Sequence, residues 1–522
     1  MSNTKTIARN TGWYGLENAI SFAVTLLTSI AIARTLGPSK MGYIIYVTWI
    51  ASIVSSLGGL GIPETTRKYM AEFLGMGDEG TARYVYFRTL LLQTVVATVA
   101  TAGIIAWVLS DATRDYVVAS ILIALSILPA MVNFVSAQAN VAAEQLSRNL
   151  PASVVSTLVF LLIIAATVLL HWGVVGVGAA MFGMRAIDCL VRLFPTMFRI
   201  LGWEKAHVLP SALSQRMMTF AWQSVASMIL ALIVWNRSEI ILLKHLCTDI
   251  RQIAFYSVAF SMAERLLISS AVFGSAAGAT IFAQYGRDKS RLPEIAASSF
   301  RYLALSSIPL HLISTALAAP ALLLLYGDRY QGATLVVTLA PLLCMPKAFI
   351  SPAQNLLQST ERQGYVILAT ILAGILDLSV AWVLIPAHGA VGACIGSGSA
   401  QILAVGMMWA ICIRLFKVKL PWRLLLRITS ISILASLAAH YVVVHFSSLW
   451  AIILGGGASL VVFFSLLYLL RVLEPEDSDR ISILTHMLPD KVADLADAVL
   501  HGLARTRKAE LAVSPVTTNT VL

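Results

Sequence analysis

The chain has 522 residues, of which 58% are hydrophobic and only 12% are charged. Soluble domains carry about 25% charged residues, so this composition excludes a soluble protein and indicates a chain that crosses a membrane many times. The formal net charge of +11 would suggest a nucleic-acid partner for a soluble protein. In a membrane protein it indicates lysine and arginine kept on the cytoplasmic side, so no nucleic-acid partner is expected.

Apolar stretches long enough to cross the hydrocarbon core as a helix, which takes about 20 residues, recur along the whole chain. They predict an all-α polytopic membrane protein with about fourteen transmembrane helices. The expected spans lie near residues 11–33, 41–61, 84–109, 117–142, 150–170, 174–198, 215–243, 252–282, 298–325, 331–357, 365–386, 389–415, 424–446 and 449–471. The loop from Ile62 to Arg83 is predicted to form an amphipathic helix at the membrane surface.

Basic residues support this count and set the orientation. If both termini are cytoplasmic, 28 of the 37 lysines and arginines fall in inner segments and only six in outer segments. The excess on one side is what the positive-inside rule requires. One missed span would invert the second half of the chain and abolish the asymmetry, so an even number of spans is favoured.

An internal repeat divides the chain into lobes. Gln138 and Gln354 occupy similar short motifs 216 positions apart, and Gly173 and Gly389 begin two further motifs at the same separation. Six spans per copy is an even number, so the copies share one orientation, which places a substrate site between two lobes. The predicted parts are an N-lobe at 1–200, a cytoplasmic linker at 201–214, a C-lobe at 215–415, a helix pair at 416–471 and a cytoplasmic tail at 472–522.

Charged residues interrupt two apolar segments of the second lobe. Trp235-Asn236-Arg237-Ser238-Glu239 lies in one, and Glu264-Arg265 lies in the next. An ionisable group at bilayer depth costs roughly 2.5–3.5 kcal/mol on insertion scales unless it faces a partner or a wet cavity. These groups predict a polar site enclosed by helices. The alternative is that the ions neutralise neighbours and only fix helix packing.

Motifs for catalysis and cofactors do not occur. The sequence lacks GxxxxGK[ST], HExxH and GxSxG, which argues against an ATP-driven pump, a zinc protease or a serine hydrolase. Five scattered cysteines show no CxxC spacing, so neither a disulfide framework nor a metal site is expected. We therefore expect no enzyme, no catalytic residues and no cofactor.

Several segments together resemble a known family. They are Ala33-Arg34-Thr35-Leu36-Gly37-Pro38, Gly59-Leu60-Gly61-Ile62-Pro63-Glu64, Asn236-Arg237 and Ala254-Phe255-Tyr256-Ser257-Val258-Ala259. With the fourteen-span layout, they are similar to the polysaccharide transporter family of Wzx-type O-antigen and exopolysaccharide flippases. That family belongs to the superfamily of multidrug, oligosaccharidyl-lipid and polysaccharide exporters. Asn236 replaces the acidic residue usual in the family, and Ala254 replaces the usual glycine.

The resemblance implies a task and a set of site residues. The task is to move a polyprenyl-pyrophosphate-linked oligosaccharide across the bacterial cytoplasmic (inner) membrane, with both termini cytoplasmic. The expected residues for pyrophosphate and sugar are Arg237, Arg265, Lys347, Arg34, Arg88, Asn18, Gln138, Asn140, Gln354 and Asn355. The expected residues for a coupling proton or cation are Glu17, Glu239, Glu264 and Asp377. For each polar residue outside the arginines, helix–helix hydrogen bonding is the competing interpretation.

Three other functions stay open from the sequence. A cation-coupled multidrug exporter or a lipid II-type flippase would share the fold. A mostly apolar cavity with one acidic residue would favour the drug exporter, and a strongly cationic cavity would favour the oligosaccharide flippase. A membrane glycosyltransferase or polymerase would need a large outer loop or a catalytic carboxylate pair, and the short predicted outer loops count against it. The expected partners are the lipid-linked oligosaccharide, membrane lipids, a polysaccharide polymerase and chain-length machinery, and the chain is expected to act as a monomer.

Overall fold

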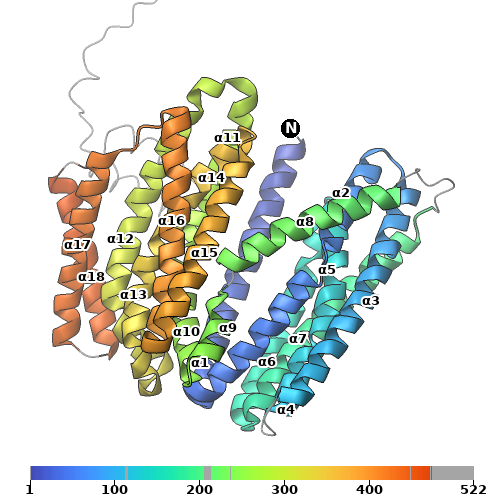
Figure 1. Ribbon diagram of the computed structural model, residues 1–522, viewed down its shortest axis with the longest axis horizontal. Helices are drawn as coiled ribbons and strands as arrows, with labels where there is room; N and C mark the ends of the chain where they lie inside the picture. Colours follow the sequence, from blue (N-terminus) through green and yellow to red (C-terminus); the bar gives the residue numbers. More distant parts are fainter. Residues whose placement is uncertain are drawn as a thin grey trace, which may run out of the picture. The chain divides into compact units, whose positions relative to one another are not determined.

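The computed structural model describes residues 2–111, 116–204, 213–235, 237–446, 448–470 and 472, and over these residues it is built from helices alone (Figure 1). The side chains of residues 2–23 lie outside the described part. The α-helices are α1 Ser2–Leu57, α2 Ile62–Gly75, α3 Glu79–Asp111, α4 Val117–Leu125, α5 Ile127–Ala142, α6 Leu150–Leu169, α7 Gly173–Leu201, α8 Leu213–Trp235, α9 Glu239–Leu246, α10 Arg251–Leu266, α11 Ile268–Arg287, α12 Leu292–Tyr326, α13 Thr334–Cys344, α14 Ile350–Ser359, α15 Gln363–His388, α16 Ala390–Phe416, α17 Trp422–His445 and α18 Ser448–Leu469. Short 3-10 helices are η1 Leu146–Arg148, η2 Lys289–Arg291, η3 Asp328–Ala333 and η4 Met345–Phe349.

Eleven helical segments among the described residues are long and apolar enough to cross a membrane, which confirms the predicted all-α polytopic fold. The first two predicted spans lie in α1, which continues across a kink at Gly37. The seventh is broken between α8 and α9, and the eighth is broken at Leu267 between α10 and α11. These interruptions explain why fewer than fourteen segments qualify, and the number fourteen stays a prediction.

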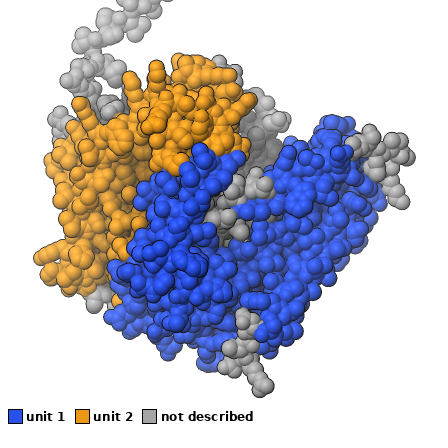
Figure 2. Space-filling view, viewed as in Figure 1, with its two compact units in different colours: residues 1–260, 325–336, 367–404 blue, residues 261–324, 337–366, 405–522 orange. Residues whose placement is uncertain are grey.

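Two compact units divide the chain (Figure 2). Unit 1 comprises residues 1–260, 325–336 and 367–404, and unit 2 comprises residues 261–324, 337–366 and 405–522. The lobe boundaries expected from the repeat stay a prediction. The predicted tail at 472–522 lies almost wholly outside the described residues.

Unit 1 is organised around a buried aromatic and aliphatic cluster. Tyr69 and Phe73 of α2, Tyr86 of α3, Ile200 of α7 and Met217 of α8 all belong to it. The predicted amphipathic helix is found as α2, and its inner face is buried against α3 and α5. The apolar stripe of α2 therefore packs into the protein, which holds α8 beside it.

The helix α8 approaches the preceding chain closely at Gly61. This residue has a φ of 66°, which lies in the left-handed region that favours glycine. A Cβ at this position would overlap the carbonyl oxygen of Ala221 in α8. The break between α1 and α2 thus lets the backbone of α8 lie directly against it.

Unit 2 has its own packing. The helices α17 and α18 pack on one another, and the Ser436 hydroxyl of α17 donates a 2.8 Å hydrogen bond to the Leu312 carbonyl of α12. In α16, the Trp409 ring nitrogen donates a 2.9 Å bond to the Phe349 carbonyl. The centroid of the Phe300 ring of α12 lies 4.8 Å from the centroid of the Phe349 ring and 4.8 Å from that of the Trp409 ring. These contacts join the C-terminal helices to the rest of the unit.

The start of α3 gives a first prediction. Asp78 precedes the helix, and its Oδ1 accepts a 2.8 Å hydrogen bond from the backbone nitrogen of Thr81. Hydrogen bonds from Thr81 hold the pKa of the Asp78 carboxyl below its usual range. Replacing Asp78 with Ala should cost about 0.5–2 kcal/mol of stability at neutral pH, because the cap is lost. Thermal unfolding in detergent measures this.

The pH dependence of the same effect follows from linkage. Because the folded-state pKa is depressed, the contribution is complete above the unfolded pKa of about 3.9 and is lost as pH falls through the folded value. The gap between wild type and Asp78→Ala should close in that range. Asp78→Asn, whose amide oxygen still caps, should resemble wild type at neutral pH. Equal losses in both variants at neutral pH would show that the charge of the carboxylate, and not its capping oxygen, supplies the stability.

Candidate functional site

Two buried carboxyl groups of unit 1 lie side by side. Glu239 is the first residue of α9, and Asp377 lies in the middle of α15; each is 1% exposed. The Glu239 side chain has as its neighbours Asp377, Tyr256 of α10 and Ser397 of α16. The structure thus brings together two of the four residues predicted for a coupling ion.

These polar atoms are close together but lack hydrogen-bond geometry. Among the described residues, neither oxygen of Asp377, nor Oε2 of Glu239, nor the Tyr256 hydroxyl has a hydrogen-bond partner. Buried polar groups without partners are rare and ask for an explanation. Two ionised carboxylates side by side in an apolar interior are strongly unfavourable. A proton or a cation between them would neutralise one charge and satisfy the open oxygens.

Small residues make this arrangement possible. A Cβ at Gly392 of α16 would overlap the backbone of α15 at Leu384, and a Cβ at Gly396 would be in tight contact with Ala381. The two helices therefore lie close together, as expected for glycines at a helix–helix interface. Ser397, next to Gly396, is thereby brought to the Asp377 region. Glu239 sits at the N-terminus of α9, where the helix dipole favours negative charge.

The three cationic site residues predicted in unit 1, Arg34, Arg88 and Arg237, lie on different elements. Arg237 has a φ of 57° in the break between α8 and α9, and its guanidinium carbon lies 4.7 Å from the centre of the Phe260 ring. Arg34 donates a 2.8 Å hydrogen bond from Nε to the Leu325 carbonyl. Arg88 is exposed and lines an apolar groove beside α8.

In unit 2, a lysine predicted to bind the pyrophosphate lies beside a glutamate predicted to bind the coupling ion. The Lys347 Nζ lies 3.8 Å from Oε1 of Glu264. Arg265 follows Glu264 directly and is half-buried at the end of α10. The ion pair neutralises both charges, as the packing interpretation of these residues supposes.

The predicted amides lie mostly at helix contacts. Gln138 is half-buried in α5, and its Oε1 has no hydrogen-bond partner in the described residues. Asn355 of α14 donates a 3.2 Å hydrogen bond to the Gly274 carbonyl of α11. Gln354 is half-buried on α14. The side chains of Glu17 and Asn18 lie outside the described part, so their roles stay predictions.

Asn140 belongs to a buried polar network in unit 1. Its amide nitrogen donates to Asn149 at 2.9 Å and to Thr196 at 3.1 Å. In the same region, Arg192 and Asp188 of α7 form an ion pair of 2.8 Å. The Asp188 carboxylate also accepts a hydrogen bond from the Asn133 amide of α5. This network links α5, α6 and α7, and the sequence offered no pattern that pairs these residues.

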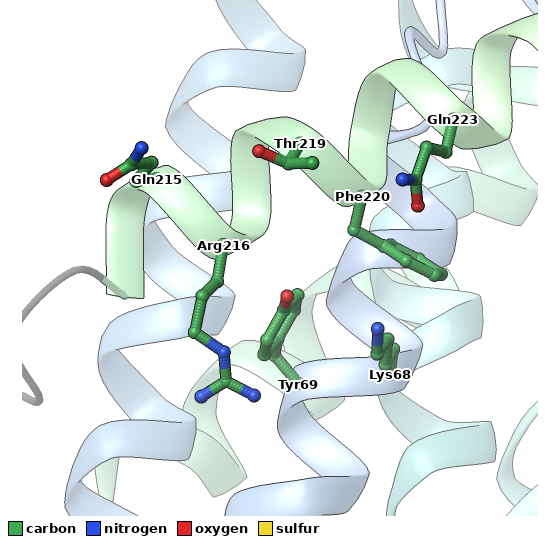
Figure 3. Close-up of a pocket in the computed structure, with 7 residues that line it drawn as sticks. All are labelled: Lys68, Tyr69, Gln215, Arg216, Thr219, Phe220 and Gln223. Atoms are coloured by element: carbon green, nitrogen blue, oxygen red, sulfur yellow. The ribbon is translucent and has the colours of Figure 1, made fainter.

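A second site of unit 1 is a cleft between α2 and α8 with a volume of about 340 Å³ (Figure 3). Lys68 and Tyr69 line it from α2, and Arg216 and Phe220 line it from α8, with the polar side chains of Gln215, Thr219 and Gln223 completing the wall. The Lys68 Nζ lies 3.9 Å from the centre of the Phe220 ring. Arg216 holds Glu72 through hydrogen bonds of 2.9 and 3.2 Å to its two oxygens.

The chemistry of this cleft suits an anionic, hydroxyl-rich group. Two cations can face a phosphate, and arginine binds phosphate oxygens in a fixed geometry. The Phe220 ring meets the buried Tyr69 ring edge to face at 6.2 Å; Phe220 is half-buried and offers apolar surface to a sugar. The volume is in the range of ligand pockets, about 300–1,000 Å³. The positive-inside pattern assigned Lys68 and Arg216 to the cytoplasmic side, and that signal alone could not show that they share a cleft.

Comparison with known proteins places these features in context. The family described as polysaccharide biosynthesis protein matches residues 7–281, slightly more than half of the chain. No curated protein matches the chain.

Solved structures of two MATE transporters and a lipid II flippase share this fold. An inward-facing multidrug resistance MATE family transporter of the MOP superfamily is 15% identical, with a TM-score of 0.64 over 76% of this chain and 95% of that one. The lipid II flippase MurJ in an inward closed conformation is 12% identical, with a TM-score of 0.64 over 88% and 98%. A point mutant of the Vibrio cholerae MATE transporter VcmN is 11% identical, with a TM-score of 0.56 over 80% and 99%. At these identities the likeness concerns the fold.

The buried network of unit 1 gives a second prediction. Replacing Asp188 with Asn removes the charge that balances Arg192 inside the protein. We expect a loss of about 3 kcal/mol of stability, at the low end for breaking a buried ion pair because asparagine keeps an acceptor oxygen. The matched control is Arg291→Gln, which breaks a 3.6 Å pair with Asp288 on an exposed surface and should cost less than about 1 kcal/mol. Chemical unfolding in detergent measures both, and equal losses would contradict the prediction.

Proposed function

Because the chain belongs to the polysaccharide biosynthesis protein family, we propose that it is a flippase for a polyprenyl-pyrophosphate-linked oligosaccharide. It moves an O-antigen or exopolysaccharide repeat unit across the bacterial cytoplasmic membrane by alternating access, and it is a transporter rather than an enzyme. The fold shared with transporters and a lipid II flippase supports this proposal. The observation that carries the substrate class is the cleft between α2 and α8.

The cleft supports an anionic glycan substrate. Lys68 has an exposed side chain, and Arg216 is half-exposed even though it holds Glu72. Both can therefore reach a phosphate that enters the cleft. The side chains of Gln215, Thr219 and Gln223 supply hydrogen-bond donors and acceptors for sugar hydroxyls. Binding of the head group here replaces part of the hydration that a pyrophosphate loses on leaving water.

The buried pair of Glu239 and Asp377 supports coupling to an ion gradient. A group that takes up and releases a proton or a cation inside the protein can bias one conformation over another. The pair is fully enclosed, so exchange with water requires the surrounding helices to move. We assign the coupling step to this pair. The ion is a proton or a hard cation, because the side chains of Asp377, Tyr256 and Ser397 beside Glu239 present oxygen.

The cation-coupled multidrug exporter is the second candidate. A site for a cationic drug would present an acidic residue to an apolar cavity. Among the residues that the structure describes, neither the cleft nor the apolar groove beside α8 is lined by aspartate or glutamate. The charges that line these two cavities are positive, which favours the oligosaccharide flippase.

The same proposal extends to location and partners. The flippase lies in the bacterial inner membrane with both termini cytoplasmic, and it works beside a polysaccharide polymerase and chain-length machinery. It acts as a monomer, because one chain holds both predicted lobes. Arg237, Arg265 and Lys347 remain candidates for the pyrophosphate at a later stage of transport.

Leaflet translocation in proteoliposomes tests the substrate. Lys68→Gln and Arg216→Gln should each lower the rate of translocation of a polyprenyl-pyrophosphate oligosaccharide by about tenfold, since a hydrogen bond to a charged group contributes about 1.5–3 kcal/mol. Arg67→Gln, an exposed cation of α2 that does not line the cleft, should behave as wild type. Thermal unfolding checks that each variant is folded, and the amount of protein incorporated into the vesicles is matched between variants.

Glu72 separates binding from scaffolding in the same assay. Glu72→Gln breaks the ion pair but leaves Arg216 free to meet an anion, so translocation should be kept or increased. If the pair only holds α2 to α8, Glu72→Gln and Arg216→Gln should lose activity equally. Full wild-type activity in Lys68→Gln and Arg216→Gln would show that the head group does not bind in the cleft.

The coupling pair has its own prediction. Glu239→Gln and Asp377→Asn should bind substrate as wild type but lose the acceleration of translocation by an imposed proton or sodium gradient. The control is Glu264→Gln, which changes a carboxyl group that is paired with Lys347. This variant should keep the acceleration. The measurement is the translocation rate with and without each gradient. A wild-type response in Glu239→Gln would exclude the pair from coupling.

A further inference from the structure

A groove of unit 1 lies beside α8, with walls from α2, α3 and α8 and a volume of about 240 Å³. Its described lining is apolar apart from a few hydroxyl groups and the charged side chain of Arg88. The residues of α8 in the groove include Met217, Met218, Ala221 and Trp222. At 100° per residue, these lie on the face of α8 opposite to the residues that line the cleft.

The position of Arg88 along α3 sets its depth. It is the last charged residue before an uncharged run of 22 residues that ends at Asp111. At 1.5 Å per residue such a run is about 33 Å long, close to the thickness of the hydrocarbon core of about 30 Å. Arg88 therefore lies at the boundary between hydrocarbon and head groups, where lipid phosphates are found.

The apolar lining extends from Arg88 into the hydrocarbon region. Leu92 and Val96 follow at intervals of four residues, so they form one stripe with Arg88 along α3, and both line the groove. The stripe covers about 12 Å of helix. A cation at the boundary with an apolar track leading inward matches a lipid that has one phosphate head and one chain.

We propose that this groove is a loading position, separate from the head-group cleft on the opposite face of α8, that holds the first part of the polyprenyl chain of the transported lipid with its phosphate on Arg88. This rests on the proposed function and adds where the lipid part binds. The groove is smaller than the pockets of about 300–1,000 Å³ that enclose whole ligands, so it takes a segment of one chain. Phospholipids of the bilayer carry two chains, whereas a polyprenyl phosphate carries one.

Binding in detergent micelles tests the proposal without transport. The probes are a polyprenyl monophosphate, a polyprenol of the same length and phosphatidylglycerol, and the readout is their affinity by native mass spectrometry. Wild type should bind the polyprenyl monophosphate most tightly. Arg88→Gln should weaken that binding about 10- to 100-fold, as expected for a charge-assisted hydrogen bond, and should leave the polyprenol unchanged.

Filling the groove tests the chain segment. Leu92→Trp should lower the affinity for the polyprenyl monophosphate and for the polyprenol alike, because the large ring fills the groove. If this variant unfolds at a lower temperature than wild type, the smaller change Leu92→Phe replaces it. The matched controls are Arg67→Gln and Val99→Trp, the latter at an exposed position of α3 outside the groove. Both should bind all probes as wild type.

Two results would overturn the proposal. If Arg88→Gln and Leu92→Trp bind the polyprenyl monophosphate as their controls do, the groove does not hold it. If phosphatidylglycerol binds wild type as tightly as the polyprenyl monophosphate does, and the same substitutions lower its affinity, the groove holds a bilayer phospholipid. A failure of the proposed function appears elsewhere: wild type would then translocate no polyprenyl-pyrophosphate oligosaccharide, whatever the binding experiment shows.

Discussion

Inside a bilayer no water is available to the backbone, so every break in a membrane helix must be satisfied by protein groups. Backbone hydrogen bonds of this kind are found at two breaks of the chain. At Gly58–Gly61, short-range bonds such as the one from the Ile62 nitrogen to the Gly59 carbonyl, at 2.8 Å, close the turn. At the break before α9, the Ile240 nitrogen reaches the Arg237 carbonyl at 3.1 Å.

These breaks decide where functional groups are found. The first lets α8 lie against Gly61, and the contact gives α8 a polar cleft on one face and an apolar groove on the other. The second ends α8 and starts α9, so Glu239 becomes the first residue of a new helix beside Asp377. An unbroken helix through residues 215–243 would carry the same side chains without the change of direction that positions them.

Much of the fold could be predicted from the sequence, because apolar length and basic residues report directly on membrane spans. The polar segment around Glu239 and the buried Asp377 were also identified, since a carboxyl group in an apolar run is conspicuous. Their pairing could not be predicted, because it depends on how α9, α10, α15 and α16 pack. Lys68 and Arg216 were missed for a related reason. Each looks like an ordinary cytoplasmic cation, and only the contact between α2 and α8 makes them neighbours.

The two faces of α8 have a mechanical consequence. Arg216 and Met217 are adjacent in the chain, yet one lines the cleft and the other lines the groove. A rotation or tilt of this single helix changes the walls of both cavities at once. Whatever fixes α8 by filling one cavity therefore alters the affinity of the other, and by thermodynamic reciprocity the second occupant acts equally on the first. Binding of a hydrocarbon chain on one face of α8 can thus change the affinity for a head group on its other face.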